Sequence, residues 1–331
     1  MKFLDRKMCL IAVLMLYAVI AAPAWSAMSD EEFVKLCQKG TAEEIQAALD
    51  AGANVNAVDR HRSTPLLSAA MLDPDPKVVE ILLKSGADVN AKDGLKYTAL
   101  YYVAKFSWLA HRFEVMNMLL DAGANAKVID SQGNTVLMLA GTYDTKRIDS
   151  DENYVKDYLG MIRRLLDAGI NVNAKNKQGE TALLFMHTKA FAMLLDAGAD
   201  VNVVDRIGAT PLMGAVAGGC DIDIVEKILK KCTKDTINAK TAGKTTALML
   251  ADNPEAITAL IKAGADIDAQ DEDGLTALMS ATARGNLEAV KALIEAGADA
   301  NIKDKKGRTA AYFARHSSKE IQAYFEERGI K

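Results

Sequence analysis

The chain has 331 residues, of which 50% are apolar and 25% are charged, and its 40 basic and 44 acidic residues give a formal net charge of -4. This balance is typical of a globular protein and excludes an intrinsically disordered chain. The negative charge argues against general nucleic-acid binding. The four cysteines and four histidines are too few and too scattered for a disulfide scaffold or a zinc cluster.

The first 26 residues have the features of a secretory signal peptide. Their charges lie near the start, three basic against one acidic: Lys2, Arg6, Lys7 and Asp5. Residues 8–22 are uninterrupted apolar, and Pro23 and small residues follow. This run of 15 residues is shorter than the ~20 that a helix needs to cross a bilayer. The pattern therefore favours a cleaved signal over a membrane anchor.

Cleavage is predicted after Ser26, with cleavage after Ala24 as the alternative, because small residues flank both positions. The mature chain would lose two net positive charges and carry a charge of -6. We therefore expect an exported protein, periplasmic or secreted, which is membrane-bound only if the signal stays uncleaved.

A two-part phrase recurs along the rest of the chain, and its first part begins at a threonine followed by proline, alanine or valine. The threonines are Thr64, Thr98, Thr135, Thr181, Thr210, Thr246, Thr276 and Thr309. A threonine side chain caps a helix by accepting a backbone N–H, and proline or alanine suits the first helical position. Each phrase therefore predicts the start of a short helix.

The second part is the end of a second helix, closed by a glycine in the left-handed conformation. The closing glycines are Gly52, Gly86, Gly123, Gly169, Gly198, Gly264 and Gly297. Apolar residues at helical spacing precede them, for example Leu287, Val290 and Leu293. The repeat unit is therefore a pair of helices. One copy has Lys234 in place of the glycine, and there we expect a weaker interface between repeats.

The connection from one repeat to the next has a constant length, because 12 residues separate each closing position from the next threonine. In many copies Asp or Asn precedes the threonine by five residues and Gly precedes it by two. These pairs are Asp130 and Gly133, Asn176 and Gly179, Asp205 and Gly208, Asp271 and Gly274, and Asp304 and Gly307. Such residues favour turns, so each connection is predicted to be a projecting β-hairpin, called a finger below.

The phrase resembles the ankyrin repeat, a unit of about 33 residues with a β-turn and two helices, which carries T-P-L-H-x-A near its start and G-A-D-V-N at its end. Residues 64–66 read Thr-Pro-Leu, and residues 86–90 read Gly-Ala-Asp-Val-Asn. The resemblance covers about residues 30–331 and implies an all-α solenoid of stacked helix pairs with short β-hairpin fingers. The family's histidine is replaced here, for example by Leu67 and Tyr101.

With this resemblance the chain divides into four parts. We expect a signal peptide at 1–26 and an N-terminal capping helix pair at 27–57. Seven repeats at 58–301 follow, with an insertion near 142–154, and a C-terminal capping repeat occupies 302–331.

No residue pattern indicates catalysis or a cofactor. Residues 243–245 are like the end of a phosphate-binding loop, but Asn238 stands where its first glycine belongs. The acidic residues 271–273 lack the flanking ligands of a calcium loop. We expect no enzyme, no cofactor, no metal and no small-molecule substrate, with a hydrolytic activity hidden in the insertion as a minor alternative.

The three cysteines after the signal are expected to be free, buried thiols. Cys220 and Cys232 stand at opposite ends of one predicted helix, about 18 Å apart at ~1.5 Å per residue, which exceeds the ~7 Å that a disulfide can span. Cys37 follows Phe33 and Leu36 on an apolar face.

The resemblance implies a non-catalytic protein-binding module, in which fingers and first helices line an extended concave surface. Two alternatives stay open. One is a membrane-tethered envelope scaffold, and the other is a secreted effector that binds host proteins.

In ankyrin-like repeats the concave side is lined by the two residues after the finger Asp, the residue before the threonine, and the residues seven and eight after it. We call these the inner positions. Their basic residues are Arg60, Lys105, Lys177, Lys189, Arg206, Arg284, Lys305, Lys306 and Arg308, and their acidic residues are Glu180, Glu272 and Asp273. The positive excess predicts a protein partner with an acidic surface.

Nine aromatic residues lie between positions 97 and 158, in and around the insertion. Aromatic anchors beside a variable loop are typical of binding hot spots. We base a predicted hot spot on four of them: Tyr97, Phe106, Trp108 and Tyr143. Core packing is the alternative, and Tyr154 and Tyr158 are expected to be buried.

Overall fold

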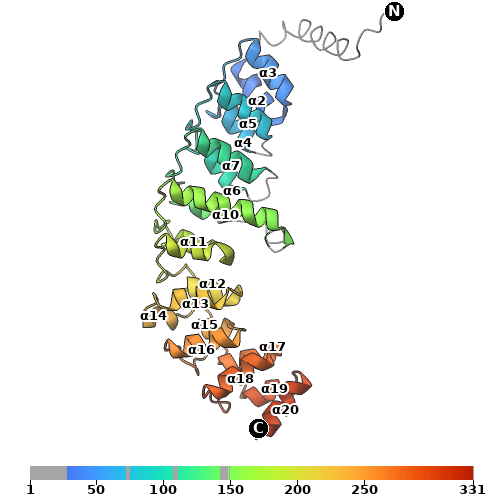
Figure 1. Ribbon diagram of the computed structural model, residues 1–331, viewed down its shortest axis with the longest axis vertical. Helices are drawn as coiled ribbons and strands as arrows, with labels where there is room; N and C mark the ends of the chain where they lie inside the picture. Colours follow the sequence, from blue (N-terminus) through green and yellow to red (C-terminus); the bar gives the residue numbers. More distant parts are fainter. Residues whose placement is uncertain (1–27, 72–74, 107–110, 142–147, 149, 331) are drawn as a thin grey trace, which may run out of the picture. The chain divides into compact units, whose positions relative to one another are not determined.

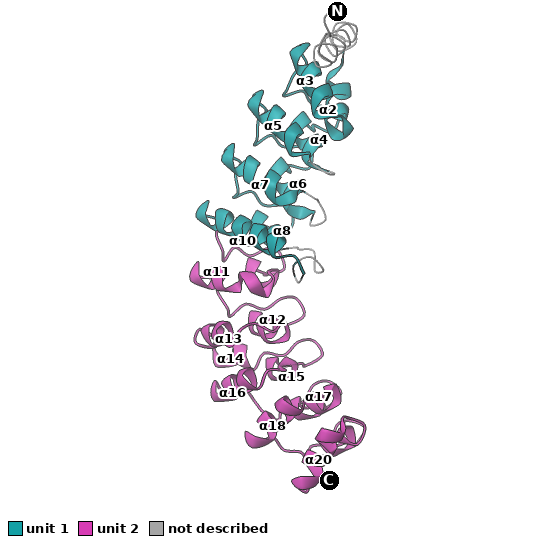
Figure 2. Cartoon of the chain, turned by 45° about the vertical axis from the view of Figure 1, so that its right-hand side comes forward, with its two compact units in different colours: residues 1–170 teal, residues 171–331 magenta. Residues whose placement is uncertain are grey.

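The computed structural model describes residues 28–71, 75–106, 111–141, 148 and 150–330 (Figure 1). The predicted signal peptide, Trp108, Tyr143 and most of the insertion lie outside these residues. The chain forms two compact units, residues 1–170 and 171–331 (Figure 2). Within the described residues, no helix is long and apolar enough to cross a membrane.

Unit 1 is a stack of helix pairs. The first helices of its pairs are α2 (Asp30–Lys39), α4 (Pro65–Met71), α6 (Ala99–Lys105) and α8 (Val136–Ala140). The second helices are α3 (Ala42–Asp50), α5 (Pro76–Lys84), α7 (Arg112–Asp121) and α10 (Glu152–Asp167). First helices pack on first helices and second helices on second helices, so each repeat contacts its neighbours (Figure 2).

Unit 2 continues the same pattern. Its first helices are η1 (Ala182–Leu184), α12 (Pro211–Ala217), α15 (Ala247–Leu250), α17 (Ala277–Arg284) and α19 (Ala310–Ala314). Its second helices are α11 (Phe191–Asp196), α13 (Ile222–Leu229), α16 (Pro254–Lys262), α18 (Leu287–Glu295) and α20 (Lys319–Glu327). A 3-10 turn, η2 (Thr188–Ala190), leads into α11. The all-α class with stacked helix pairs is confirmed.

The recurring threonines and glycines act as the sequence predicts. Six threonine hydroxyls accept the backbone N–H three residues later, at 3.2–3.4 Å: Thr64, Thr98, Thr135, Thr210, Thr246 and Thr276. All seven closing glycines have a positive φ, between 71° and 99°. The other two threonines differ. The buried hydroxyl of Thr181 has no hydrogen-bond partner and only the 3-10 turn η1 follows it, and Thr309 makes no side-chain cap bond to α19.

The fingers are hydrogen-bonded turns and not strands in the described residues. In each of the five predicted Asp or Asn fingers, one side-chain oxygen accepts two backbone N–H groups, as Asp271 does from Asp273 and Leu275. The backbone of Asp271 also donates to the Leu275 carbonyl at 3.0 Å. Only an isolated bridge, Ile129 with Thr135, has strand-like pairing there, because the sides of a finger are too short for a ladder.

Asparagine side chains connect neighbouring repeats at the base of the fingers. Five asparagines each make two bonds to the end of the second helix in the next repeat. The Nδ2 group donates to a backbone carbonyl there, and Oδ1 accepts the N–H of the residue two positions after that carbonyl. These asparagines are Asn56, Asn90, Asn173, Asn202 and Asn238. Asp268 occupies the same place but makes only the accepting bond, from the Asp299 N–H at 2.9 Å. These bonds hold adjacent fingers at a fixed separation.

The copy without a closing glycine ends in a different way. Helix α13 stops at Leu229, and an additional turn, α14 (Lys234–Ile237), follows with Thr233 as its cap. Asn202 bonds to the carbonyl of Lys231 and the N–H of Thr233, so the connection between repeats is kept here. Both bonds to Asn202 thus form at the copy where the missing glycine predicted a weaker interface.

Candidate functional site

Two tyrosines of unit 1 form a stacked pair where one finger meets its helix. Tyr97, directly before Thr98, is half-buried, and Tyr101 in α6 is buried. Their ring centroids are 4.0 Å apart and their planes differ by 5°. Tyr102 lies edge-on to both rings, at 5.8 and 5.9 Å. The Tyr97 ring is therefore supported by two buried rings.

Two finger carboxylates fix the buried rings. The Tyr101 hydroxyl donates to Asp130 at 3.3 Å, and the Tyr102 hydroxyl donates to Asp93. Burial raises the pKa of both tyrosines above the usual value, so both hydroxyls remain protonated donors. The other oxygen of each carboxylate accepts backbone N–H groups of its own finger. Hydrogen bonds within the chain therefore hold both buried rings in place.

Lys105, at the end of α6, places an exposed ammonium beside this cluster. Its Nζ is 5.9 Å from the ring centroid of Tyr97, 5.7 Å from that of Tyr101 and 5.8 Å from that of Phe106. In the part of the chain that the structure describes, no carboxylate forms an ion pair with it. The sequence predicted Lys105 as an inner-position residue and Tyr97 and Phe106 as hot-spot residues, and the structure brings the three together.

Leu95 belongs to the same finger and was not predicted. Its side chain is 68% exposed, the largest value among the exposed large apolar residues described. It is the second residue after Asp93, an inner position, and Lys96 beside it has a φ of 67°. The signal that could have found it was an apolar residue at a finger tip, where polar residues are usual.

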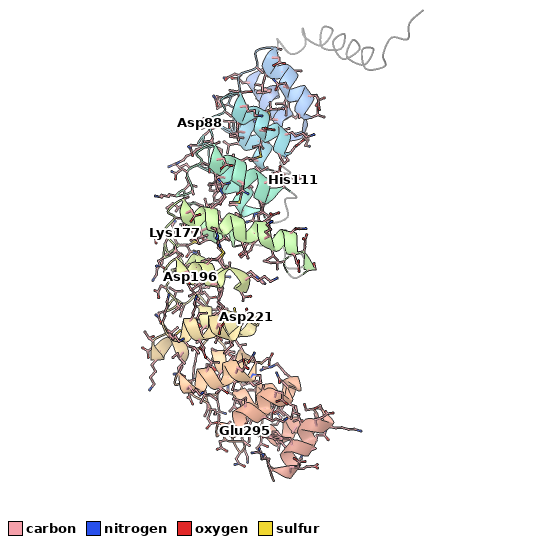
Figure 3. The ribbon with its side chains drawn as sticks, in the orientation of Figure 1. Asp88, His111, Lys177, Asp196, Asp221 and Glu295 are labelled. Atoms are coloured by element: carbon pink, nitrogen blue, oxygen red, sulfur yellow. The ribbon has the colours of Figure 1, made fainter. Side chains whose placement is uncertain are left out.

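The other basic residue predicted at an inner position of unit 1, Arg60, is exposed on its finger. Its Nε lies 3.7 Å from Glu31, an exposed pair that contributes little energy. In unit 2 five predicted basic residues are exposed: Lys177 (Figure 3), Lys189, Arg206, Lys305 and Lys306. These side chains can meet a partner.

Two predicted arginines are bound within the protein. Arg284 forms an ion pair with Asp252 at 2.8 Å and donates to the carbonyls of Met249 and Ala251, so it joins α17 to the end of α15. Arg308 forms an ion pair at 2.6 Å with Asp304, whose side chain is fully buried. Their charges are largely neutralised, which reduces the positive excess of the inner positions. Of the three predicted acids, Glu272 and Asp273 are exposed and Glu180 accepts from Asn176.

Most of the other aromatic residues between 97 and 158 are core. Tyr101, Tyr102, Phe113, Tyr154 and Tyr158 are buried. The structure thus assigns these five to packing and leaves Tyr97 and Phe106 partly accessible. Trp108 and Tyr143 lie outside the described residues.

A buried arginine was missed altogether. Arg112, at the start of α7, is 1% exposed and donates to the carbonyls of Val103, Ala104, Leu139 and Ala140, which end α6 and α8. Burial lowers the pKa of its guanidinium to about 10, so it stays charged at neutral pH. It fixes the ends of two first helices. Arginine at a helix start gives no sequence signal for such a role.

The described residues contain no group of three or more His, Cys, Asp or Glu side chains that could hold a metal. Cys37, Cys220 and Cys232 are free thiols, the first buried and the other two half-buried. Burial raises the pKa of Cys37 to about 12 and those of Cys220 and Cys232 to about 11, so none is a reactive thiolate at neutral pH. What the arrangement offers is a set of exposed basic, aromatic and apolar side chains on rigid repeats.

A stack of helix pairs that presents finger side chains defines a class of repeat protein built for binding. Family models described as ankyrin repeats match residues 66–107, 185–271 and 246–330. This chain belongs to the ankyrin-repeat family.

Relatives of the chain come from distant organisms. It is 34% identical over 104 residues to an ankyrin repeat protein of Acanthamoeba polyphaga mimivirus, which covers 30% of this chain and 62% of the relative. It is 31% identical over 121 residues to ankyrin repeat and SOCS box protein 6 of Mus musculus, a match that covers 36% of this chain and 28% of the relative. It is 35% identical over 102 residues to an E3 ubiquitin-protein ligase of Arabidopsis thaliana, a match that covers 30% of this chain and 6% of the relative. The chain thus spans less than two thirds of each relative.

Ankyrin repeats indicate a protein–protein interaction module. The homologues of this chain are generally non-catalytic, although two of the relatives are named as E3 ubiquitin-protein ligases.

Proposed function

We propose that this chain is an exported, non-catalytic module that binds an acidic protein partner through the inner positions of its repeats. The observation that carries the proposal is a set of exposed basic side chains at those positions without an ion-pair partner in the described residues: Lys105, Lys177, Arg206, Lys305 and Lys306. Because folding leaves these charges unpaired, an acidic partner can neutralise them. Such contacts speed encounter and select the partner by charge.

Charge reversal tests the binding surface. A triple variant with Lys177→Glu, Arg206→Glu and Lys306→Glu should lose capture of the partner that the native chain retains from the cell envelope. The matched control carries Lys92→Glu, Lys156→Glu and Lys262→Glu, which are exposed but not at inner positions. Capture by the native chain should fall as salt is raised, because the Debye length is ~10 Å at 0.1 M and ~3 Å at 1 M. Equal loss in both triple variants, or capture that is indifferent to salt, would contradict the proposal.

Export rests on the predicted signal peptide. Amino-terminal sequencing of the protein from its native envelope should find Ala27 first, or Trp25 if cleavage follows Ala24. A chain that starts at Met1 and needs detergent for extraction would support the membrane-tethered scaffold instead. A chain found outside the producing cell would favour the secreted effector.

A further inference from the structure

Among the rings of the described residues, none stacks on the face of Tyr97 that points away from Tyr101. Tyr101 stacks on one face, and Tyr102 is perpendicular to the pair and nearly equidistant from both centroids, at 5.8 and 5.9 Å. An edge-on ring at equal distances lies beside a stack and not above it. The second face of Tyr97 is therefore open to another flat or apolar group, as far as rings among the described residues are concerned.

The Lys105 ammonium also lies beside the stack. Its distances to the Tyr97 and Tyr101 centroids, 5.9 and 5.7 Å, are nearly equal although these centroids are 4.0 Å apart. It therefore does not lie above the outer face of Tyr97. The finger carboxylates nearest to this cluster, Asp93 and Asp130, already bond to tyrosine hydroxyls and backbone N–H groups. Lys105 thus presents its charge for an external anion.

The finger that carries Tyr97 also has an exposed apolar side chain, in addition to the positive charge of Lys105 beside the ring. Leu95, 68% exposed, belongs to the finger that carries Tyr97. The inner positions of the three fingers at 59–63, 93–97 and 130–134 include Arg60 and His61 but no carboxylate. A partner therefore needs an apolar group for Tyr97 and Leu95 and an acidic group for Lys105.

We infer that Tyr97, Leu95 and Lys105 form a subsite for an extended, acidic peptide segment whose carboxylate and aromatic side chains stand two residues apart. The spacing follows from geometry, because the Lys105 ammonium is 5.9 Å from the Tyr97 centroid. An extended chain advances ~3.3 Å per residue, so side chains at positions i and i+2 share a face and are ~6.6 Å apart. The aromatic ring stacks on Tyr97 while the carboxylate pairs with Lys105. This inference rests on the proposed function and names the chemistry of one contact within it.

Fluorescence polarisation with labelled peptides tests the subsite on the full chain. The probe repeats the unit Glu-Ser-Phe-Ser, which places each glutamate two residues from a phenylalanine. One comparison peptide repeats Glu-Phe-Ser-Ser, with the same composition but no such spacing, and another repeats Gln-Ser-Phe-Ser. The native chain should bind the probe about tenfold more tightly than either comparison, a ratio equal to about 1.4 kcal/mol.

Matched variants assign the effect to named side chains. Tyr97→Ala and Lys105→Met should each weaken probe binding about tenfold, as expected for removal of a hot-spot residue. Tyr97→Phe keeps the stacking ring and should bind like the native chain. Lys92→Met, an exposed lysine of the same connection that is not at an inner position, should also leave binding unchanged. Circular dichroism melts identify any variant that fails to fold; if Tyr97→Ala does, Lys105→Met, a change at an exposed side chain, still decides.

Each result bears on the subsite separately from the proposed function. Native affinity in Lys105→Met, or equal binding of the three peptides, would overturn the subsite while leaving partner capture by other inner positions intact. Probe binding that depends on Tyr97 and Lys105, together with partner capture that survives the triple charge reversal, would support the subsite and overturn the broader proposal.

Discussion

Thr181 and Thr276 begin equivalent phrases but differ in their hydrogen bonds. The Thr276 hydroxyl accepts the Met279 N–H at 3.3 Å, whereas the Thr181 hydroxyl is buried without a partner. Thr276→Val should lower the free energy of unfolding by about 1 kcal/mol, the usual value of an N-cap. Thr181→Val should be neutral or stabilising, because it removes an unsatisfied buried group. Urea denaturation of both variants measures this, and equal losses would show that Thr181 also caps.

Gly179 and Gly274 occupy the same place in their fingers, with φ values of 80° and 82°. A Cβ on Gly179 meets no atom within 4 Å, but one on Gly274 would lie 2.9 Å from the backbone nitrogen of Lys305 in the next finger. Gly179→Ala should therefore cost only the left-handed conformation, about 1–2 kcal/mol. Gly274→Ala should cost at least ~1 kcal/mol more, because backbone must also move. Thermal unfolding of the two variants tests the difference, and identical melting temperatures would refute it.

At the scale of the elements, the asparagine connections suggest a stabilising change. Asp268 accepts from Asp299 but, as a carboxylate, cannot donate to the Gly297 carbonyl in the way that Asn238 donates to Gly264 at 2.9 Å. Asp268→Asn should add this bond and raise the free energy of unfolding by about 0.5–1.5 kcal/mol. Asn238→Ala, which removes three side-chain hydrogen bonds, should lower it by about 1–3 kcal/mol. Loss of stability in Asp268→Asn, measured by urea denaturation, would show that the carboxylate itself matters.

Arg112 joins three elements and predicts a large effect. Arg112→Met leaves four helix-end carbonyls without their donor and should destabilise unit 1 by about 3–5 kcal/mol, as removal of a buried charged partner does. Arg112→Lys should recover part of this, because an ammonium can donate to three acceptors. Arg163→Met, at an exposed position of α10, is the control and should stay within about 0.5 kcal/mol. Denaturant unfolding of the three variants should give this order, and a small loss in Arg112→Met would mean that the carbonyls find other donors.

Capping chemistry was readable from the sequence because it is local, so the positions of most helix starts and ends were predicted. The exception is the repeat after Thr181, where only 17 residues separate the threonine from Gly198. Too few residues remain for a complete first α-helix, so the 3-10 turns η1 and η2 form ahead of α11. The register also brought Tyr97 and Lys105 together correctly. It could not show that Arg284 is neutralised, because its partner Asp252 is 32 residues away and no local pattern connects them.

On the scale of the whole molecule, stability should vary along the chain, because each repeat depends on its own helices and its neighbours. Residues 182–190 combine 3-10 turns with an uncapped threonine, whereas residues 234–240 are tied by Asn202 and Asn238. In native-state hydrogen exchange we expect residues 182–190 to open more readily than 234–240, and both more readily than α17. If residues 230–260 open first, the missing closing glycine at Lys234 determines local stability, as the sequence analysis predicts.

The bonds that define each finger also affect how quickly the protein reaches its fold. A finger carboxylate bonds to N–H groups two and four residues away, as Asp205 does, and Asn56 reaches Gly86 only 30 residues later. In the repeat with the insertion the separation along the sequence is larger but still modest, since Arg164 bonds to Asn117 across 47 residues. Chains dominated by such near contacts close small loops, so bringing the contacting residues together costs less conformational entropy. Each repeat can therefore form as soon as its predecessor is in place, whichever end of the chain becomes available first.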